Sequence, residues 1–303
     1  MNKKISYLKS YAKDFLIQTI LKFRFTKNKN FNKIEKIDKI KLNVPKAKHW
    51  ALSSKILINN IRLYGVNFFL RFNIIQGTMF LNDESLSEKI LKKKIIKKYR
   101  SILNENSFGY PVLSKKYKFT SINKMHQLHH LLFFKDKIKK NLKIKNILEI
   151  GAGYGLLSSI ALKILKPKKI TIFDLEIFIF LQKVYLGNII NNFLMHKFNF
   201  HNNLTSLRVS QKKFRPNLTF AMWSLSEMPI KLRENLIPII FDSDFILIGY
   251  QEKFENINNL AYFKNLQKKK LNYKFQNIKV PYLKNNFYLF AEKIKNINEK
   301  KYK

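Results

Sequence analysis

Up to about residue 145, apolar residues recur mostly every three or four positions, which is the spacing of amphipathic helices. The predicted helical segments are 1–44, 53–100 and 122–138, with a turn-rich segment at 106–121. Within 81–100 we predict one helix, because Asn82 or Asp83 can cap its start and lysines crowd its last turn. The first part of the chain is therefore predicted to be mostly helical.

After residue 145 the pattern changes to short apolar runs that alternate with helical stretches. The runs predicted as strands are 146–151, 168–174, 204–209, 217–224, 244–251, and the pair 275–283 and 286–294. Strands that alternate with helices favour an α/β fold with a Rossmann-like, mainly parallel sheet and helices on both faces. We therefore expect a basic helical N-terminal region over 1–120, with a substrate-binding or capping role, and an α/β domain over 121–303.

Three of the chain's eight glycines stand at alternate positions after the first predicted strand, in the sequence Glu149-Ile-Gly151-Ala-Gly153-Tyr-Gly155. A P-loop would end in Gly-Lys-Ser or Gly-Lys-Thr, and the dinucleotide motif G-x-G-x-x-G would place its third glycine one position later. Asp174 ends the next predicted strand, 19 positions after Gly155, where a carboxylate can bind both hydroxyls of a ribose. The alternative is a tight turn whose glycines merely permit packing, and it leaves Glu149 and Asp174 unexplained.

These residues suit S-adenosylmethionine, which carries a ribose diol, an ammonium and a sulfonium but no phosphate. A carboxylate at Glu149 can oppose the positive charge, and Asp174 can bind the ribose hydroxyls. We therefore predict S-adenosylmethionine as the cofactor. The predicted cofactor-binding residues are Glu149, Gly151, Gly153, Gly155, Asp174, Leu175 and Trp223.

The segment from Glu149 to Gly155, with the strand that follows it, resembles motif I and its partner in class I S-adenosylmethionine-dependent methyltransferases. Within that superfamily, 220–229 (FAMWSLSEMP) and 173–186 (FDLEIFIFLQKVYL) resemble the sugar O-methyltransferases of bacterial polysaccharide clusters. The resemblance covers roughly 108–293, and this chain lacks the proline that the family carries after Leu175. It implies the class I methyltransferase fold and methyl transfer to a sugar hydroxyl of a surface polysaccharide or its precursor.

The segment that follows the fourth predicted strand holds the first candidates for catalysis. Glu227 can accept the proton of an attacking hydroxyl, and Trp223 can shape the pocket. Alternatively, Ser226 and Glu227 cap the helix that begins near Pro229. The segment lacks the Asn/Asp-Pro-Pro-aromatic pattern of adenine-N6 methylases, which argues against a nucleobase as the methyl acceptor.

His126 and His130 lie four positions apart on one face of a predicted helix, and His129 lies beside them. A histidine side chain can act as a base toward a hydroxyl, so His130 and His126 are the next catalytic candidates. The alternative is a structural or exposed role for all three histidines. No carboxylate stands at a matching spacing, so no metal site is predicted.

The formal net charge of +40 would suit a polyanion such as RNA or an anionic membrane surface. However, 52 of the 59 basic residues are lysine and only seven are arginine, whereas proteins that clamp phosphates rely on arginine. The lysines are accompanied by abundant asparagine and isoleucine, which favours the codon bias of an AT-rich genome as the explanation of the positive charge. No specific nucleic-acid partner is therefore predicted, although the charge would allow peripheral association with an anionic membrane surface.

The chain has no cysteine, which excludes disulfides and thiolate chemistry, and no apolar run of the ~18 residues that a membrane span needs. We predict a cytoplasmic enzyme with a sugar or glycan substrate, and the sequence leaves its oligomeric state open. Two alternatives are an RNA methyltransferase, prompted by the charge, and a scaffold that binds a partner through its basic N-terminal region. The intact set of Glu149, the glycines and Asp174 argues against the scaffold.

Overall fold

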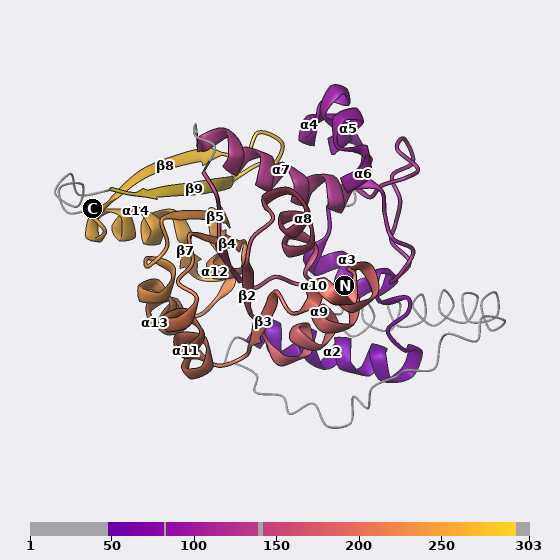
Figure 1. Cartoon of the computed structure of the whole chain (residues 1–303), viewed down its shortest axis with the longest axis horizontal. Helices are drawn as coiled ribbons and strands as arrows, with labels where there is room; N and C mark the ends of the chain where they lie inside the picture. The colour runs from indigo at the N-terminus through magenta and orange to yellow at the C-terminus, as the bar shows by residue number, and fades with distance from the viewer. Residues whose placement is uncertain (1–47, 82, 139–141, 295–303) are drawn as a thin grey trace. The chain divides into compact units, whose positions relative to one another are not determined.

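The structure is a computed structural model that describes residues 48–81, 83–138 and 142–294. The chain divides into two compact units, and Figure 1 labels most of their helices and strands. The helical unit comprises the chain up to His126 together with 183–189, and the sheet unit comprises 127–182 and the chain from Ile190 onward. The helix predicted over 1–44 lies outside the described residues.

The described part of the helical unit consists of short helices and irregular segments. Its elements are α2 (Lys48–Tyr64), η2 (Phe69–Arg71), α3 (Asn73–Met79), η3 (Glu84–Leu86), α4 (Ser87–Ile90), α5 (Lys93–Lys98), α6 (Arg100–Leu103) and the start of α7 (Ile122–Lys137). The single helix predicted over 81–100 is wrong, because Leu91 and Lys92 have extended backbone. This break allows both Ile90 and Leu91 to be buried, so tertiary packing overrides helix propensity. Asp83 caps η3 by accepting a hydrogen bond from Ser85 N at 2.9 Å, and Asn82 lies outside the described residues.

Aromatic rings form part of the core of the helical unit. The ring centroid of Tyr185, which belongs to segment 183–189, lies 6.0 Å from that of Phe69 and 6.5 Å from that of Phe108. Gly109 has φ +80°, and a Cβ there would lie 2.8 Å from Phe69 and from Leu70. The turn-rich segment thus approaches these rings closely, at a residue that must be glycine.

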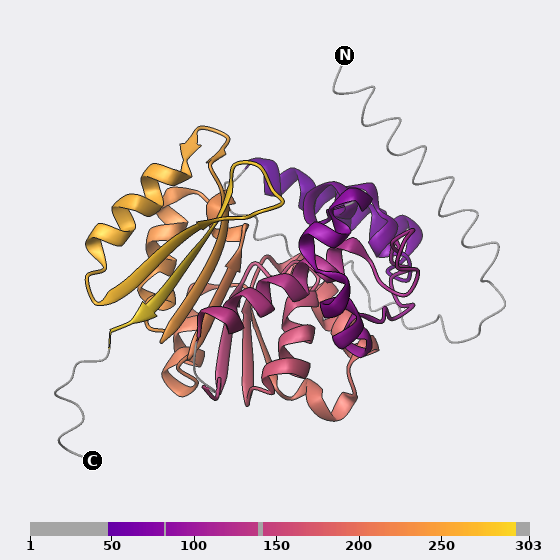
Figure 2. The same ribbon diagram turned by 90° about the horizontal axis from the view of Figure 1, so that it is seen from above.

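The sheet unit is built on seven strands in the order β3-β2-β1-β4-β5-β9-β8 (Figure 2). The strands are β1 (Asn146–Ile150), β2 (Lys169–Phe173), β3 (Phe198–His201), β4 (Leu218–Met222), β5 (Phe245–Gln251), β8 (Tyr273–Lys279) and β9 (Asn286–Lys293), and β6 (Lys253–Phe254) and β7 (Ile257–Asn258) form a separate hairpin. The first five are parallel, and β9 is antiparallel to both β5 and β8. The order in which strands are added reverses between β1 and β4: β2 and β3 lie on one side of β1, and β5 lies on the far side of β4. A ligand crevice is therefore expected at the carboxyl ends of β1 and β4.

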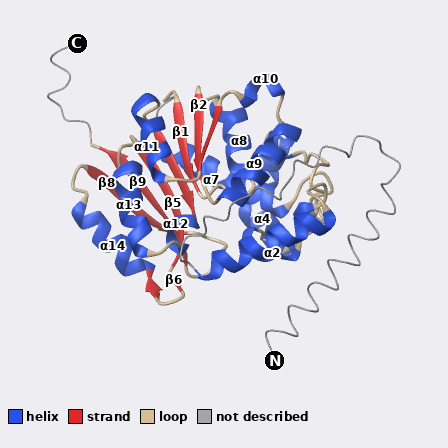
Figure 3. Ribbon diagram, turned by 90° about the horizontal axis from the view of Figure 1, so that it is seen from below, coloured by secondary structure: helices blue, strands red, loops and turns tan. Residues whose placement is uncertain are grey.

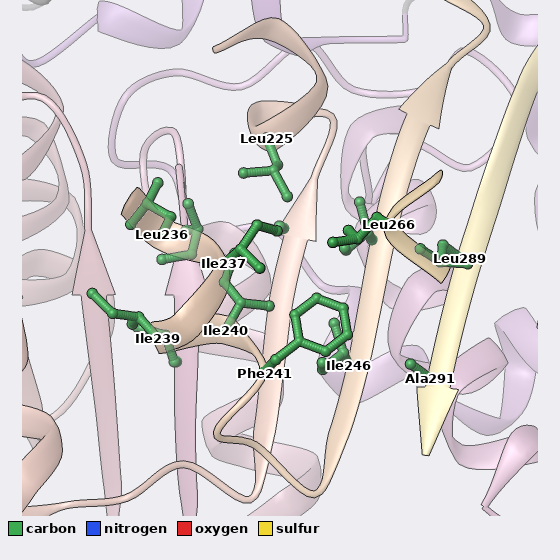
Figure 4. Packing of buried hydrophobic residues seen from close by; sticks show 14 of the residues in the cluster. Leu225, Leu236, Ile237, Ile239, Ile240, Phe241, Ile246, Leu266, Leu289 and Ala291 are labelled. Carbon is green, nitrogen blue, oxygen red and sulfur yellow. The ribbon is translucent and has the colours of Figure 1, made fainter. Parts of the chain in front are cut away.

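Helices flank both faces of this sheet (Figure 3). The helices after α7 are α8 (Leu156–Leu165), α9 (Glu176–Ile189), α10 (Asn192–Met195), α11 (Leu204–Lys213), α12 (Ser224–Glu227), α13 (Ile230–Ile240) and α14 (Asn259–Lys269). Side chains of α11, α13 and α14 pack with Ile246, Leu289 and Ala291 of the strands in one buried cluster (Figure 4). On the other face, the ring of Phe134 in α7 lies 5.9 Å from that of Phe220 and 6.0 Å from that of Phe245.

The strand order, the antiparallel β9 and the helices on both faces are those of the class I methyltransferase fold, so the predicted fold class is confirmed. One predicted strand is wrong, because 204–209 lies in α11 and the third strand is β3. Asn203 explains the error, since its side chain accepts a hydrogen bond from Ser206 N at 2.9 Å and starts a helix there. Across the described ranges, no helix is long and apolar enough to cross a membrane.

Candidate cofactor and acceptor site

The turn between β1 and α8 contains the three alternate glycines, and each has a positive φ. Gly151 (φ +69°) donates its N–H to Phe173 O at 2.8 Å, which ties the turn to the end of β2. A Cβ on Gly151 would lie 2.2 Å from the Cβ of Ser224, so no side chain fits beside the start of α12. Gly155 (φ +91°) is the N-cap residue of α8 and has left-handed backbone. The turn therefore depends on glycine both for its conformation and for its contact with α12.

Asp174 lies directly after β2, and its carboxylate is hydrogen-bonded to the glycine turn. Its Oδ2 accepts hydrogen bonds from Gly153 N at 3.2 Å and from Gln182 Nε2 at 2.8 Å. Its Oδ1 accepts one from Leu175 N at 2.8 Å. The predicted residues Gly153, Asp174 and Leu175 thus lie together at the carboxyl end of β2.

Glu149 is the second carboxylate of this region, and it pairs in register with Phe220 of β4. It is only 4% exposed and accepts a hydrogen bond from Ser158 Oγ of α8. Burial, with a smaller contribution from the charge of Asp174, raises the pKa of Glu149 to about 7. Burial also raises the pKa of Asp174 to about 7, although its N–H donors act in the opposite direction. Two such carboxylates favour a positively charged ligand, because a cation stabilises their ionised forms.

Gln182, in the second turn of α9, is a site residue that the sequence analysis missed. Its side chain is fully buried, and Nε2 donates to Gly153 O at 2.9 Å as well as to Asp174. Its Oε1 is buried without a hydrogen-bond partner among the described residues. No pattern in the sequence distinguishes this glutamine from other polar residues of the helix, so only the fold reveals that it braces Asp174.

His201, the last residue of β3, is a second missed residue. Its carbonyl accepts a hydrogen bond from Asp174 N at 3.1 Å, so it lies beside the carboxylate site. Its Nδ1 lies 3.1 Å from Ser206 Oγ, and its Nε2 is buried with no hydrogen-bond partner in the described ranges. A correct assignment of the third strand would have placed this histidine at the same edge of the sheet.

Trp223, the residue after β4, has left-handed backbone with φ +60°, which costs on the order of 1–3 kcal/mol for a bulky residue. Three contacts hold it there. Its N–H donates to Gly249 O at 2.7 Å, its Nε1 donates to Asn286 Oδ1 at 2.5 Å, and its ring centroid lies 5.3 Å from that of His130. Strain retained at the carboxyl end of a strand is typical of functional positions.

His130 is fully buried beside Trp223 and is part of a cluster of two histidines and two tyrosines. Its Nδ1 lies 2.7 Å from the hydroxyl of Tyr288, which lies 3.2 Å from Nδ1 of His129. The Tyr282 hydroxyl lies 2.9 Å from the same nitrogen of His129. Burial lowers the pKa of His129 to about 4 and raises the pKa of both tyrosines, so these three groups are neutral at pH 7. The rings of His130 and Tyr288 in this buried cluster pack against the ring of Trp223.

Glu227 is the last residue of α12 and is half-buried. Its Oε1 accepts a hydrogen bond from Gln251 Nε2, at the end of β5, at 3.2 Å. The N-cap position of α13, which the alternative role assigned to Ser226 and Glu227, is occupied by Pro229, which makes no side-chain cap hydrogen bond. His126, one helical turn before His130, is 6% exposed and belongs to the helical unit.

The two parts of the candidate site are joined through Ser224. Its hydroxyl donates to Ile150 O, immediately before the glycine turn. Glu149 near the end of β1, Asp174 after β2, and the segment from Trp223 to Glu227 after β4 therefore lie at the carboxyl ends of neighbouring strands. Within the described residues, no group of three or more histidine, aspartate or glutamate side chains is placed to hold a metal ion.

No protein-family model matches this chain, and no curated protein sequence matches it. The methyltransferase domain of bacterial CtHen1 is similar to it in structure, with 12% identity and a TM-score of 0.45, over 56% of this chain and 97% of that one. An rRNA methylase from Streptococcus thermophilus has 12% identity and a TM-score of 0.42 over the same shares. Magnesium protoporphyrin IX methyltransferase from Synechocystis PCC 6803, solved with bound SAM, has 13% identity and a TM-score of 0.40, over 71% and 98%. At these values the matches say nothing about the substrate, and the fold assignment rests on the strand order itself.

Proposed function

We propose that this chain is an S-adenosylmethionine-dependent methyltransferase. The observation that carries the proposal is the pair of carboxylates Glu149 and Asp174, buried or half-buried beside the glycine turn. The negative charge of Glu149 would repel the pyrophosphate of a dinucleotide. The pair suits a ligand with a ribose diol and two positive charges, since Asp174 can accept the ribose hydroxyls and Glu149 can oppose the charge.

We infer that the methyl acceptor is a hydroxyl group. When bound, S-adenosylmethionine supplies a methyl group on a positively charged sulfur. Glu227 orients the hydroxyl and accepts its proton as the oxygen–methyl bond forms and the carbon–sulfur bond breaks. The products are a methyl ether, a neutral thioether and a protonated Glu227, so charge and atoms balance.

Within this class, we propose a sugar of a surface polysaccharide or its precursor as the acceptor. The resemblance of 220–229 to sugar O-methyltransferases supports this choice. The partly exposed indole of Trp223 adds to it, because such a ring can stack on the C–H face of a pyranose. The residues from Trp223 to Glu227 would then contact the sugar, while the glycine turn holds the cofactor.

The test is the substitution Glu227→Gln, assayed with a radiolabelled methyl donor and nucleotide-sugar or polysaccharide acceptors. Loss of a general base lowers turnover by about 10²–10⁴-fold. We expect this loss with unchanged cofactor affinity and melting temperature. Glu292→Gln is the matched control, because Glu292 is exposed and pairs with Phe245 at the start of β5, away from the carboxyl ends of the parallel strands. Wild-type turnover in Glu227→Gln would contradict a role for Glu227 in proton transfer.

A second candidate function is methylation of RNA, which the net charge of +40 favours. Incubating the enzyme with the labelled donor and either total RNA or glycan acceptors separates the two functions. Label that enters RNA and not glycans would replace the sugar proposal, while leaving the cofactor proposal intact.

A further inference from the structure

Arg233, in α13, is a fully buried cation that lies against the Trp223–Glu227 segment. Its guanidinium donates to three neutral oxygens: Ser226 O, Met228 O at 2.8 Å, and Asn259 Oδ1 at 2.7 Å. Burial of a guanidinium is costly unless its donors are satisfied, and here all three donor nitrogens are bonded. All three of these hydrogen-bond acceptors are neutral, so the positive charge itself calls for an explanation.

The two backbone carbonyls bound by Arg233 flank Glu227 on either side. A single rigid fork therefore fixes the Ser226–Glu227 peptide unit and the Met228–Pro229 peptide unit, one on each side of Glu227. The hydrogen bond to Asn259 continues the network, since Asn259 Nδ2 donates to Gln251 O at 3.0 Å. Gln251 in turn donates to the Glu227 carboxylate, so the network returns to the residue that it surrounds.

Ser226 closes this network from the side of Trp223. Its hydroxyl lies 2.6 Å from Trp223 O and 2.7 Å from Gln251 Oε1. The amide of Gln251 is thereby oriented with its oxygen toward Ser226 and its nitrogen toward Glu227. The direction of the hydrogen bond to the carboxylate is thus set by neighbouring groups and not by the carboxylate alone.

Arg233 also acts on Glu227 through charge. Burial lowers the pKa of Arg233 to about 10, while Tyr262 and the negative charge of Glu227 act in the opposite direction. The attraction is reciprocal, so the guanidinium favours the ionised form of Glu227. The other titratable groups around Arg233 are Tyr262, whose ring centroid lies 4.9 Å from the guanidinium carbon, and Glu234, whose charge acts on Tyr262.

We propose that Arg233 is a positioning residue for methyl transfer, which holds Glu227 toward the acceptor through Ser226 O and Met228 O and keeps its carboxylate ionised. This inference rests on the proposed role of Glu227. The competing explanation is a purely structural arginine that joins α12, α13 and α14. The two explanations differ in whether removing the cation changes the titration of Glu227.

The first test measures the titration of Glu227 itself and needs no methyl acceptor. Carbon-13 NMR of glutamate-labelled protein follows each carboxyl, and the Glu227 signal is identified by its absence from Glu227→Gln. In Arg233→Gln we expect the Glu227 signal to titrate about one pH unit or more higher than in the wild type. Arg233→Lys keeps the charge and should leave the titration close to that of the wild type. Arg215→Gln is the control, because Arg215 is a partly exposed arginine paired with Asp242 and Asp244. An unchanged midpoint in Arg233→Gln would overturn the electrostatic part of the proposal.

The second test uses turnover. Arg233→Gln and Arg233→Lys should each lower turnover by about 10- to 100-fold, a part of what a general base contributes, with unchanged cofactor affinity. In the Glu227→Gln background the same substitutions should have little further effect, because they act through Glu227. An equal loss in both backgrounds would overturn the proposal in favour of the structural explanation.

If Arg233→Gln does not fold, Asn259→Leu replaces it, since this change removes one anchor of the guanidinium and leaves the cation in place. It should lower turnover per folded molecule, and it should also lower the melting temperature, because Nη1 of Arg233 and Gln251 O each lose a hydrogen-bond partner. Unchanged turnover per folded molecule would contradict the positioning role. A chain that shows the Glu227 titration shift but methylates no hydroxyl acceptor would refute the proposed function, while the pairing of Arg233 with Glu227 would stand.

Discussion

The Cβ of Ser224 lies 2.2 Å from where a Cβ on Gly151 would be, so the turn after β1 and the helix after β4 touch at a glycine. We predict that Gly151→Ala destabilises the protein by about 2 kcal/mol or more, since a left-handed backbone alone costs ~1–2 kcal/mol for a residue other than glycine. The double variant Gly151→Ala/Ser224→Gly removes the clash and should recover part of that loss. Urea denaturation measures both changes. No recovery in the double variant would mean that the contact with Ser224 does not restrict this position.

Asp174 should dominate the affinity for S-adenosylmethionine. Asp174→Asn keeps the shape and removes the charge, and hydrogen bonds to charged groups contribute roughly 1.5–3 kcal/mol, so we expect affinity to fall by about 10- to 100-fold. Gln182→Leu removes the side chain that braces Asp174 and should have a smaller effect, of about tenfold or less. Isothermal titration calorimetry measures both, and Glu292→Gln serves as the control. Wild-type affinity in Asp174→Asn would refute the assignment of the ribose site.

The raised pKa values of Glu149 and Asp174, both about 7, predict a dependence of stability on pH. Between about pH 4 and pH 7 the folded protein keeps protons on these carboxyls that the unfolded chain has released. The free energy of unfolding therefore falls as pH rises through this interval, and the loss is complete above about pH 7. Melting temperatures from pH 5 to pH 8 test this, and Glu149→Gln should flatten the slope. Equal slopes in the wild type and Glu149→Gln would contradict the raised pKa of this residue.

The same carboxylates predict that binding of S-adenosylmethionine releases protons. A cation favours their ionised forms, so affinity should rise with pH up to about pH 7. S-adenosylhomocysteine, which lacks the sulfonium charge, should show a weaker dependence. Calorimetry in two buffers of different ionisation enthalpy counts the protons released. Identical behaviour of the two ligands would show that the carboxylates do not sense the sulfonium.

The surplus of lysine predicts weak, salt-sensitive binding to nucleic acids, without sequence preference. The affinity for RNA should fall steeply between 50 and about 200 mM salt, as expected for binding dominated by counterion release. Fluorescence anisotropy with RNAs of unrelated sequence measures both the salt dependence and the selectivity. A tight, sequence-selective complex at physiological salt would support the RNA methyltransferase instead.

The cofactor part of the site could be predicted from the sequence because its residues are close along the chain. Glu149, the glycines and Asp174 belong to consecutive elements, and the spacing of one strand–turn–helix–strand unit places them together. The Arg233 network could not be predicted, since Gln251 and Asn259 come from separate elements that only the folded sheet unit brings to Glu227. The position of His201 was missed for a local reason, because Asn203 starts a helix where alternating apolar residues had predicted a strand.

The ring of Tyr185 packs against Phe69 and Phe108, yet it follows both in the chain by more than seventy residues. During translation, β1 and β2 are therefore synthesised before Tyr185, which completes this aromatic cluster of the helical unit. At roughly 5–20 residues per second, Phe108 waits several seconds for its partner to emerge. A fragment that ends at His126 would lack Tyr185 altogether and leave an apolar surface open to aggregation. Folding of the N-terminal part is thus coupled to translation of the sheet unit, and the order of synthesis is not the order in which the two units are completed.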